Sequence, residues 1–431
     1  MNPALSPVPI GTVATPLSTV FSPSTSRRAA AITRAILDQL PPLQTSDCTI
    51  ELWDGTHYPD SQERSCKLIL RHPGSMRAMF QSQTALALAQ SHVLGLWDVE
   101  GNWQALFDLS EQMARLQHTP LKKARLAFQL LQLPWPRVPK PKGWREPAHL
   151  QGKPHSIERD KAAVEYHYNA GNDFYAQFLD ETMTYSCAQF TSAEDSLQAA
   201  QERKFEAVCQ SLQLKRGQRL LDVGCGWGGL AIYAAKNYGV EVVGITLSIP
   251  QAQEANRRIR EAGLEKQCRV LVSDYREITE KATFDAISSI EMFEHVGSEM
   301  LTTYFSQAYA LLKPGGLFLN QGTTVENSNS CKRFPEFIKQ YVFPDGEVVP
   351  VHVSIKASED AGLEVLRVES MRENYVQTCA HWVKNLEAKR EEIIEMVGEP
   401  TWRIWRLYTA ASGHGFRVAR LNCFQTLMRK L

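Results

Sequence analysis

The chain has 431 residues, of which 43% are hydrophobic and 22% charged, and its 47 basic side chains balance its 47 acidic ones. This composition indicates a globular protein of about two or three domains. A formal net charge of zero argues against a nucleic-acid binder that relies on bulk positive charge. The nine cysteines include no C-x-x-C pair, so we expect no disulfide framework, no metal site and a reducing cytoplasm. The sequence shows neither an apolar run of about 18 residues nor a signal peptide.

The N-terminal third of the chain changes character twice. Residues 1–26 are rich in Pro, Ser and Thr and are predicted to be disordered. Residues 27–133 predict a small α+β domain, with lipid or membrane binding as its candidate role. Its elements are expected at residues 29–40 (helix), 48–53 and 67–71 (strands), and 76–94 and 103–116 (helices).

Residues 121–131 predict a short basic amphipathic helix. Leu121, Ala124, Phe128 and Leu131 share one face, and the cations Lys122, Lys123 and Arg125 lie beside it. Such a helix can contact a membrane surface, or it can pack on its own domain with its cations in solvent, which is the more common arrangement. Residues 134–154 follow as a proline-rich linker whose cations could extend a basic surface toward anionic phospholipid.

From residue 155 to 431 the pattern is that of a second, larger domain. Strands are predicted at 220–223, 240–245, 268–272, 284–289 and 317–320, with helices between them. This alternation predicts a doubly wound α/β sheet, in which ligands bind outside the carboxyl ends of the strands. After residue 321 we expect helices.

The first strand of this domain runs into a glycine cluster, Gly224, Gly226, Gly228 and Gly229. Glycines allow the main chain to approach a ligand that side chains would block. The spacing is not that of a dinucleotide-binding loop. The acidic Asp222 before the first glycine suits a ligand that carries an amine. The stretch resembles the S-adenosylmethionine-binding loop of class I methyltransferases.

Several further motifs occur in order along the chain. They lie at residues 185–187, 221–229, 244–248 with Gln251, 274–276, 293–297, 341–346, Tyr375 and 415–420. Together they closely resemble the cyclopropane-fatty-acyl-phospholipid synthase family, which includes mycolic acid cyclopropane synthases and fatty-acyl C-methyltransferases. The resemblance covers about residues 160–425 and is weaker in the N-terminal domain. It implies a class I methyltransferase fold, a Rossmann-like doubly wound sheet with helical additions.

The resemblance also implies a set of cofactor-binding residues. Gly224 and Gly226 would lie near the methionine part of S-adenosylmethionine, Asp274 would accept from the adenine amine, and Tyr275 would lie against the ring. The full implied set is Tyr185, Ser186, Gly224, Gly226, Thr246, Leu247, Gln251, Asp274 and Tyr275.

The chemistry that the family implies is methyl transfer to the double bond of an unsaturated phospholipid acyl chain. This step leaves a carbocation, so the site must be dry and rich in aromatic rings. A base must then remove a proton, and loss from the new methyl closes a cyclopropane ring whereas loss elsewhere leaves a branch. The family uses a bound bicarbonate, which cysteine, glutamate, histidine and tyrosine hold; by motif these include Cys187, Glu294 and Tyr375.

One member of this cage differs. Gln321 stands where the family has histidine, and glutamine can neither carry positive charge nor shuttle a proton. Bicarbonate could still bind, more weakly, or a protein group such as Glu202 could be the base; a surface position on its helix is the more common arrangement for a residue such as Glu202. The first expected product is a cyclopropane, and the alternative is a methylene- or methyl-branched chain. A non-catalytic lipid-binding relative and a small-molecule methyltransferase are further alternatives.

The roles of three other residues stay open. His295 either orders its loop or contacts the cofactor or a carboxylate, His167 either covers the site or is structural, and Cys225 is expected to be a packing residue. The family further implies a cytoplasmic enzyme that is peripheral on the inner face of the cell membrane and that could form a homodimer.

Overall fold

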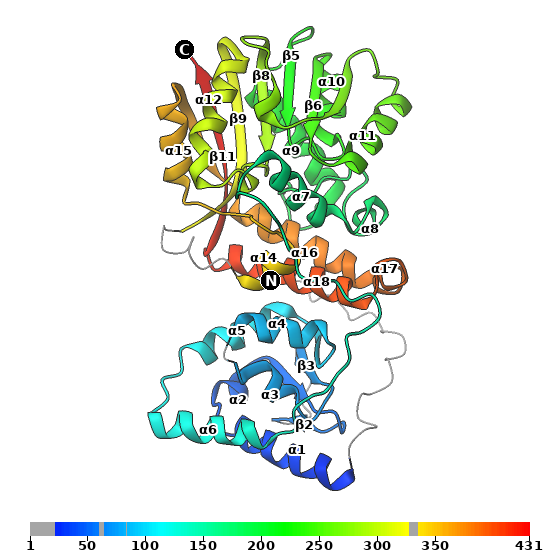
Figure 1. Cartoon of the computed structure of the whole chain (residues 1–431), viewed down its shortest axis with the longest axis vertical. Helices are drawn as coiled ribbons and strands as arrows, with labels where there is room; N and C mark the ends of the chain where they lie inside the picture. Colours follow the sequence, from blue (N-terminus) through cyan, green and yellow to red (C-terminus); the bar gives the residue numbers. More distant parts are fainter. Residues whose placement is uncertain (1–21, 60–63, 83, 327–334) are drawn as a thin grey trace. The chain divides into compact units, whose positions relative to one another are not determined.

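The computed structural model describes residues 22–59, 64–82, 84–326 and 335–431. The chain divides into two compact units, residues 1–144 and 145–431 (Figure 1). The expected linker over 134–154 is therefore shared between them. In the first unit Arg77 lies over the ring of Trp135 at 5.4 Å. In the second, the amide of Ala148 donates to the carbonyl of Gln340 at 2.7 Å. Proline-rich composition predicts extended chain, but it does not tell whether that chain packs.

The first unit is an α+β structure around a sheet of order β2-β1-β3-β4, in which only β1 and β3 are parallel. Its first helix begins at Pro23, so residues 23–26 are helical rather than disordered as predicted; residues 1–21 lie outside the described residues. The hydroxyl of Ser22 caps this helix by accepting from the amide of Thr25, a Ser-Pro start signal that the composition argument overlooked. The elements are α1 (Pro23–Leu37), α2 (Pro42–Thr45), β1 (Cys48–Glu51), β2 (His57–Tyr58), β3 (Cys66–Leu70), α3 (Ser75–Phe80), α4 (Ala85–Val93), β4 (Trp97–Gly101), α5 (Trp103–Ala114) and α6 (Pro120–Gln132).

The second unit contains a seven-stranded sheet of order β10-β11-β9-β8-β5-β6-β7, parallel except for β11, which is antiparallel to both neighbours. Its strands are β5 (Arg219–Val223), β6 (Glu241–Thr246), β7 (Cys268–Val272), β8 (Phe284–Ile290), β9 (Leu312–Val325), β10 (Leu363–Ser370) and β11 (Leu421–Lys430). The five strands predicted from the sequence are all present. The prediction of helices alone after residue 321 was wrong, because β9 continues to Val325 and β10 and β11 follow. Both late strands lack a continuous apolar run, since β10 is a largely exposed edge and the apolar residues of β11 are interrupted by the polar pair Gln425 and Thr426.

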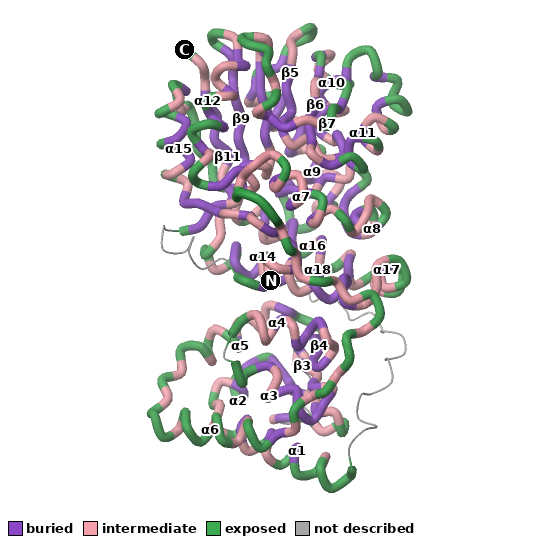
Figure 2. The backbone as a smooth tube through the Cα atoms, in the orientation of Figure 1, coloured by how far each residue is buried: buried purple, intermediate pink, exposed green. Residues whose placement is uncertain are grey.

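Helices cover both faces of this sheet (Figures 1 and 2). Leu220 packs with the helices α9 to α11 on one face, whereas its neighbour Leu221 packs with α12 on the other. Successive strand residues point to opposite faces, so a strand that is covered by helices on both faces has a continuous run of buried apolar residues. The helices are α7 (Ile157–Tyr168), α8 (Asn172–Ala176), α9 (Leu197–Ser211), α10 (Gly229–Tyr238), α11 (Ile249–Glu261), α12 (Leu301–Leu311), α14 (Glu336–Tyr341), α15 (Val351–Asp360), α16 (Arg372–Ala388), α17 (Arg390–Val397) and α18 (Glu399–Arg417). In Figure 1, α7, α16 and α18 lie at the end toward which the parallel strands run.

Candidate active site

A cleft lies at the carboxyl ends of β5 to β8, under helix α7. Seven of the nine predicted cofactor-binding residues line it: Gly224, Gly226, Thr246, Leu247, Gln251, Asp274 and Tyr275. Glu291, Met292 and His295, from the turn after β8, complete one wall. The sheet topology therefore places residues that are far apart in the sequence in the one position where an α/β sheet binds ligands.

The glycine loop is built for close approach of a ligand. Gly224 has φ +73°, and a Cβ atom there would lie 2.6 Å from Cγ of Met292, so both the backbone and the neighbouring side chain require glycine. Beneath the loop, Asp222 accepts a hydrogen bond from the hydroxyl of Ser288 at 2.7 Å. Burial raises the pKa of Asp222 to about 6, so at neutral pH it places a negative charge under the loop.

The other side of the cleft carries polar groups suited to an adenosine. Oγ1 of Thr246 donates to Oε1 of Gln251 at 2.7 Å, which holds the pair at the end of β6. The carboxylate of Asp274 accepts three hydrogen bonds from Arg276, one from its amide and two from its guanidinium. The backbone N–H of Glu277 also donates to this side chain in a capping box, so an adenine amine would share one of its acceptor positions. These residues fit S-adenosylmethionine.

Tyr185 and Ser186 lie outside the lining of this cleft. Tyr185 belongs to an aromatic cluster, with its ring centroid 5.0 Å from that of Trp382. Ser186 is buried, and its hydroxyl accepts from Nζ of the buried Lys204 at 3.0 Å. Contact of either residue with the cofactor therefore stays a prediction.

Three of the cage residues predicted from the motifs donate hydrogen bonds to the carboxylate of Glu291, for which the sequence predicted no role. Oε1 of Glu291 accepts from the backbone N–H of Cys187 at 2.8 Å and from Nε2 of Gln321 at 3.0 Å. Oε2 accepts a short hydrogen bond from the hydroxyl of Tyr375. Glu291 also has φ +54°, a left-handed conformation uncommon for a residue with a side chain. Its place directly after a predicted strand was the available signal.

Glu294 lies in the same turn, and its Oε1 accepts from the amide of Thr323 at 2.5 Å. Burial and, second, the charge of Glu291 raise the pKa of Glu294 to about 8. Burial also raises the pKa of Glu291, against the hydrogen bonds from Tyr375, Cys187 and Gln321, which lower it. The charge on Glu291 disfavours ionisation of Glu294, so the two buried carboxyls titrate as a coupled pair.

The chain matches a known protein family and several of its members. The family model "mycolic acid cyclopropane synthetase" matches residues 155–426. The chain belongs to this family. It is 34% identical over 401 residues to a probable fatty acid methyltransferase of Pseudomonas putida, covering 92% of this chain and 95% of that protein. It is 36% identical over 264 residues to the cyclopropane-fatty-acyl-phospholipid synthase of Escherichia coli K12, covering 61% and 66% respectively.

A solved structure of a family member also matches. The mycolic acid cyclopropane synthase CmaA1, complexed with SAH and CTAB, has a TM-score of 0.60 at 32% identity, covering 63% of this chain and 98% of that chain. The family and the class I methyltransferase fold predicted from the sequence are confirmed. The protein is an S-adenosylmethionine-dependent methyltransferase that acts on lipid chains.

The bicarbonate implied for the family does not fit beside Glu291. The three donors of the cage, from Cys187, Gln321 and Tyr375, all donate to the Glu291 carboxylate. A second anion would find these donors occupied and would meet the negative charge of the Glu291–Glu294 pair without a compensating hydrogen bond.

Four further residues to which the sequence assigned possible roles lie in different environments. Glu202 is exposed on α9 and accepts from Gln198 at 2.7 Å, so the hypothesis that it is the substitute base was wrong. His167 is fully buried, and its Nδ1 lies 2.7 Å from the carbonyl oxygen of Val342, which indicates a structural role. His295 lines the cleft, and burial lowers its pKa to about 4, so it is neutral there. Cys225 packs over Gly244, as expected.

The surroundings of the cage are aromatic. The ring of Tyr375 stacks on Phe416 with centroids 4.2 Å apart, and Trp382 lies 6.0 Å from Tyr375. The ring of Tyr185 contacts both Trp382 and Trp405, which extends the cluster. Aromatic faces attract cations and exclude water, so this region suits the carbocation that alkene methylation produces.

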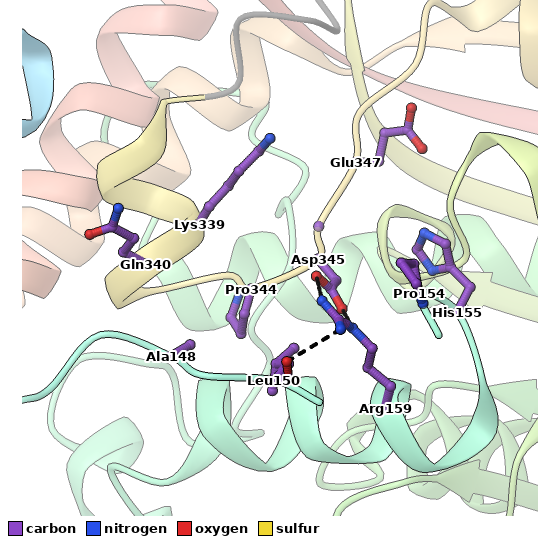
Figure 3. Close-up of a pocket in the computed structure, with 11 residues that line it drawn as sticks. Ala148, Leu150, Pro154, His155, Arg159, Lys339, Gln340, Pro344, Asp345 and Glu347 are labelled. Atoms are coloured by element: carbon purple, nitrogen blue, oxygen red, sulfur yellow. Dashed lines mark hydrogen bonds and ion pairs between the residues drawn. The ribbon is translucent and has the colours of Figure 1, made fainter. Parts of the chain in front are cut away.

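A separate cavity of about 390 Å³ lies between the segment before α7, helix α14 and the loop over 344–347 (Figure 3). Arg159 crosses it, donating to both carboxylate oxygens of Asp345 and to the carbonyl of Leu150 at 3.3 Å. The ion pair joins α7 to the loop over 344–347, and the hydrogen bonds from Arg159 to the carbonyls of Leu150 and Gly152 hold the segment before α7. None of the residues predicted to bind the cofactor or to form the cage lines this cavity.

Proposed function

We propose that the protein transfers a methyl group from S-adenosylmethionine to one carbon of the double bond of an unsaturated phospholipid acyl chain, and that the product carries a one-carbon branch. The observation that carries the proposal is the position of the Glu291 carboxylate, which lines the cofactor cleft and lies in a cage flanked by aromatic rings. A methyl donor, a dry cation-stabilising region and a base are the three things that alkene methylation needs.

The bound cosubstrate supplies an electrophilic methyl group. The π electron pair of the alkene forms the new C–C bond, the C–S bonding pair goes to sulfur, and the second alkene carbon becomes a cation. Loss of a proton from the adjacent CH2 then leaves a methyl branch beside a shifted double bond. A 1,2-hydride shift followed by loss from the methyl gives a methylene branch, and direct loss from the methyl gives a ring. All three routes release one proton.

Two observations support a branch over the ring that the sequence placed first. The first observation is the glutamine at residue 321, whose side chain has no titratable proton. It donates to the Glu291 carboxylate at the position where the ring-forming relatives have a histidine. The Pseudomonas putida relative that covers both units is named a fatty acid methyltransferase, whereas the match to the Escherichia coli synthase covers 61% of this chain. The cyclopropane product is kept as the second candidate.

We further propose that the enzyme works at the surface of a membrane, through α6. The apolar face predicted for this helix is not packed, since Leu121 is 83% exposed and Phe128 64%. Figure 2 shows α6 coloured as exposed and intermediate along its length. None of its residues is buried, and Lys123 and Arg125 are exposed beside this face. Among the described residues no helix has the length and hydropathy to cross a bilayer. An exposed apolar face with flanking cations suits an anionic phospholipid surface.

The test is expression in a bacterium that lacks its own cyclopropane synthase, followed by analysis of extracted phospholipids. We expect an acyl-chain mass gain of one CH2, with olefinic or vinylidene protons and without high-field ring protons in the proton NMR spectrum. Ring protons would instead support the second candidate. Absence of any mass gain, with S-adenosylmethionine bound normally, would contradict methyl transfer to acyl chains and favour a non-catalytic lipid-binding protein.

A further inference from the structure

We propose that the carboxylate of Glu291 is the base of the reaction and that it takes the place of a bound anion, so that the enzyme needs no bicarbonate. This inference rests on the proposed function and identifies the group that removes the proton from the methylated chain. Each feature of the Glu291 environment argues for that role.

The first feature is the donor set. Two N–H groups and one phenol, from Cys187, Gln321 and Tyr375, converge on one trigonal carboxylate. This is the arrangement that holds an ionised carboxylate in a buried site, because charge-assisted hydrogen bonds offset the loss of hydration. The cage is therefore complete without an exogenous anion.

The second feature is the remaining acceptor capacity. Oε1 of Glu291 uses both of its acceptor positions on the Cys187 amide and on Gln321, and it also lies 3.8 Å from Sγ of Cys423. Oε2 accepts only the Tyr375 hydroxyl among the described hydrogen bonds, which leaves one position free to take a proton. Glu291 lines the cofactor cleft, so the proposal assigns this free position of Oε2 to the proton of the methylated chain.

The third feature is the backbone. Glu291 keeps φ +54° in the tight turn between β8 and the Phe293–His295 turn. A side chain in this conformation is strained, and such strain persists where the surrounding structure over-determines it. Glycine would relieve the strain but would remove the carboxylate on which the three donors converge.

The proposed step is balanced by the groups present. The C–H bonding pair of the cationic chain becomes the new C=C bond, or the ring C–C bond, and the proton moves to Oε2 of Glu291. The hydrogen bonds from the Cys187 amide and Gln321 stay on Oε1 throughout. The neutral carboxylic acid then releases the proton to water through the cleft, which restores the base after the product leaves.

The experiment compares Glu291→Gln and Glu291→Gly with the wild-type enzyme on vesicles of an unsaturated phospholipid, in buffers depleted of carbon dioxide or supplemented with bicarbonate. We expect wild-type turnover to be indifferent to bicarbonate. Glu291→Gln should lose about 10²- to 10⁴-fold in turnover, the usual contribution of a general base. Glu291→Gly should lose as much but regain at least tenfold with bicarbonate, acetate or propionate, whereas chloride should not restore it. Glu291→Gln should not respond, because its amide fills the space.

The variants also need a readout that is independent of turnover. Calorimetric titration with S-adenosylhomocysteine should show that both variants still bind the cofactor product. Carbon-13 NMR of labelled bicarbonate should show binding to Glu291→Gly and not to the wild-type enzyme. Bicarbonate-dependent wild-type turnover, bicarbonate binding to the wild-type protein, or Glu291→Gln activity within tenfold of wild type would each overturn the inference. A wild-type enzyme that methylates no acyl chain would instead overturn the proposed function, and the labelled-bicarbonate result would still decide the anion question.

Discussion

Gln425 donates a hydrogen bond from Nε2 to Oε1 of Gln321 at 2.9 Å, across a directly paired position of β11 and β9. This contact orients the Gln321 amide, since its oxygen faces Gln425 and its NH2 group faces Glu291. The reverse orientation would bring an oxygen against a carboxylate. A strand that the sequence analysis missed therefore decides which end of Gln321 reaches the active site.

Replacing Gln321 with leucine should lower turnover by about tenfold, because it removes one of three charge-assisted donors from the proposed base. Steady-state kinetics on unsaturated vesicles measures the effect. Gln425→Leu is the matched control: it keeps the donor but frees the amide to rotate, and its loss should be smaller. Gln321→His should remain independent of bicarbonate while Glu291 is present. Wild-type turnover in Gln321→Leu would remove the amide from the mechanism.

The pH dependence of turnover should follow the buried carboxyl pair. Burial raises the pKa of both Glu291 and Glu294, so the base is protonated and turnover falls as pH drops, beginning above the usual range of glutamate. Glu294 has the higher pKa, about 8, because the charge on Glu291 disfavours its ionisation, so Glu294 is neutral where Glu291 titrates. Glu294→Gln should therefore leave the acidic limb of the kcat profile in place, and a limb that moves to lower pH would show that Glu294 is ionised there.

The same pair predicts how stability depends on pH. The folded-state pKa of Glu294, about 8, is above its unfolded value of 4.5, so the folded protein binds the extra proton between these values. The contribution of Glu294 to the free energy of unfolding should therefore decline as pH rises from about 4.5 to about 8, by a few kcal/mol at most. In denaturant unfolding, the free energy of unfolding of Glu294→Gln should rise relative to that of the wild-type protein as pH increases across this window. Parallel curves for the two proteins would contradict the burial argument.

Gly224→Ala should abolish cofactor binding or weaken it at least tenfold and lower the melting temperature. The added Cβ would lie 2.6 Å from Cγ of Met292, in addition to the cost of φ +73° for alanine. Gly263→Ala is the matched control, since Gly263 has φ +69° with no atom within 4 Å of the added Cβ. Calorimetry and thermal melting should separate the two. Equal losses would mean that backbone conformation alone explains the effect.

Neutralising three cations of α6, as Lys122→Gln, Lys123→Gln and Arg125→Gln, should weaken binding to phosphatidylglycerol vesicles on the order of a hundredfold, at about 1 kcal/mol per cation. Co-sedimentation measures it. The control carries the same change at three exposed cations of the second unit, Lys236, Lys266 and Arg269. Equal binding by both triple variants would argue against α6 as the membrane-binding surface.

Local sequence patterns predicted correctly those parts of the fold whose signal lies within one short stretch of the chain. The run from Leu220 to Val223 followed by Gly224 and Gly226 predicts strand, turn and ligand approach, and the structure has each of them. The edge strand β10 escaped prediction because it has one buried residue, so burial imposes almost no pattern on it. Glu202 and Glu291 look alike in a sequence, but one is exposed on α9 and the other accepts three hydrogen bonds.

Residue types at short, ordered spacings were enough to predict the family, the cofactor loop and the cage residues Cys187, Glu294, Gln321 and Tyr375. That the cage encloses the carboxylate of Glu291 follows from the tertiary fold alone. Cys187, Glu291, Gln321 and Tyr375 come from a loop, a turn, a strand and a helix, and they meet because parallel strands end at one edge of the sheet. Hydrogen-bond geometry acts over about 3 Å in space and leaves no trace in chain order, so the change at residue 321 could be interpreted only together with the carboxylate at residue 291.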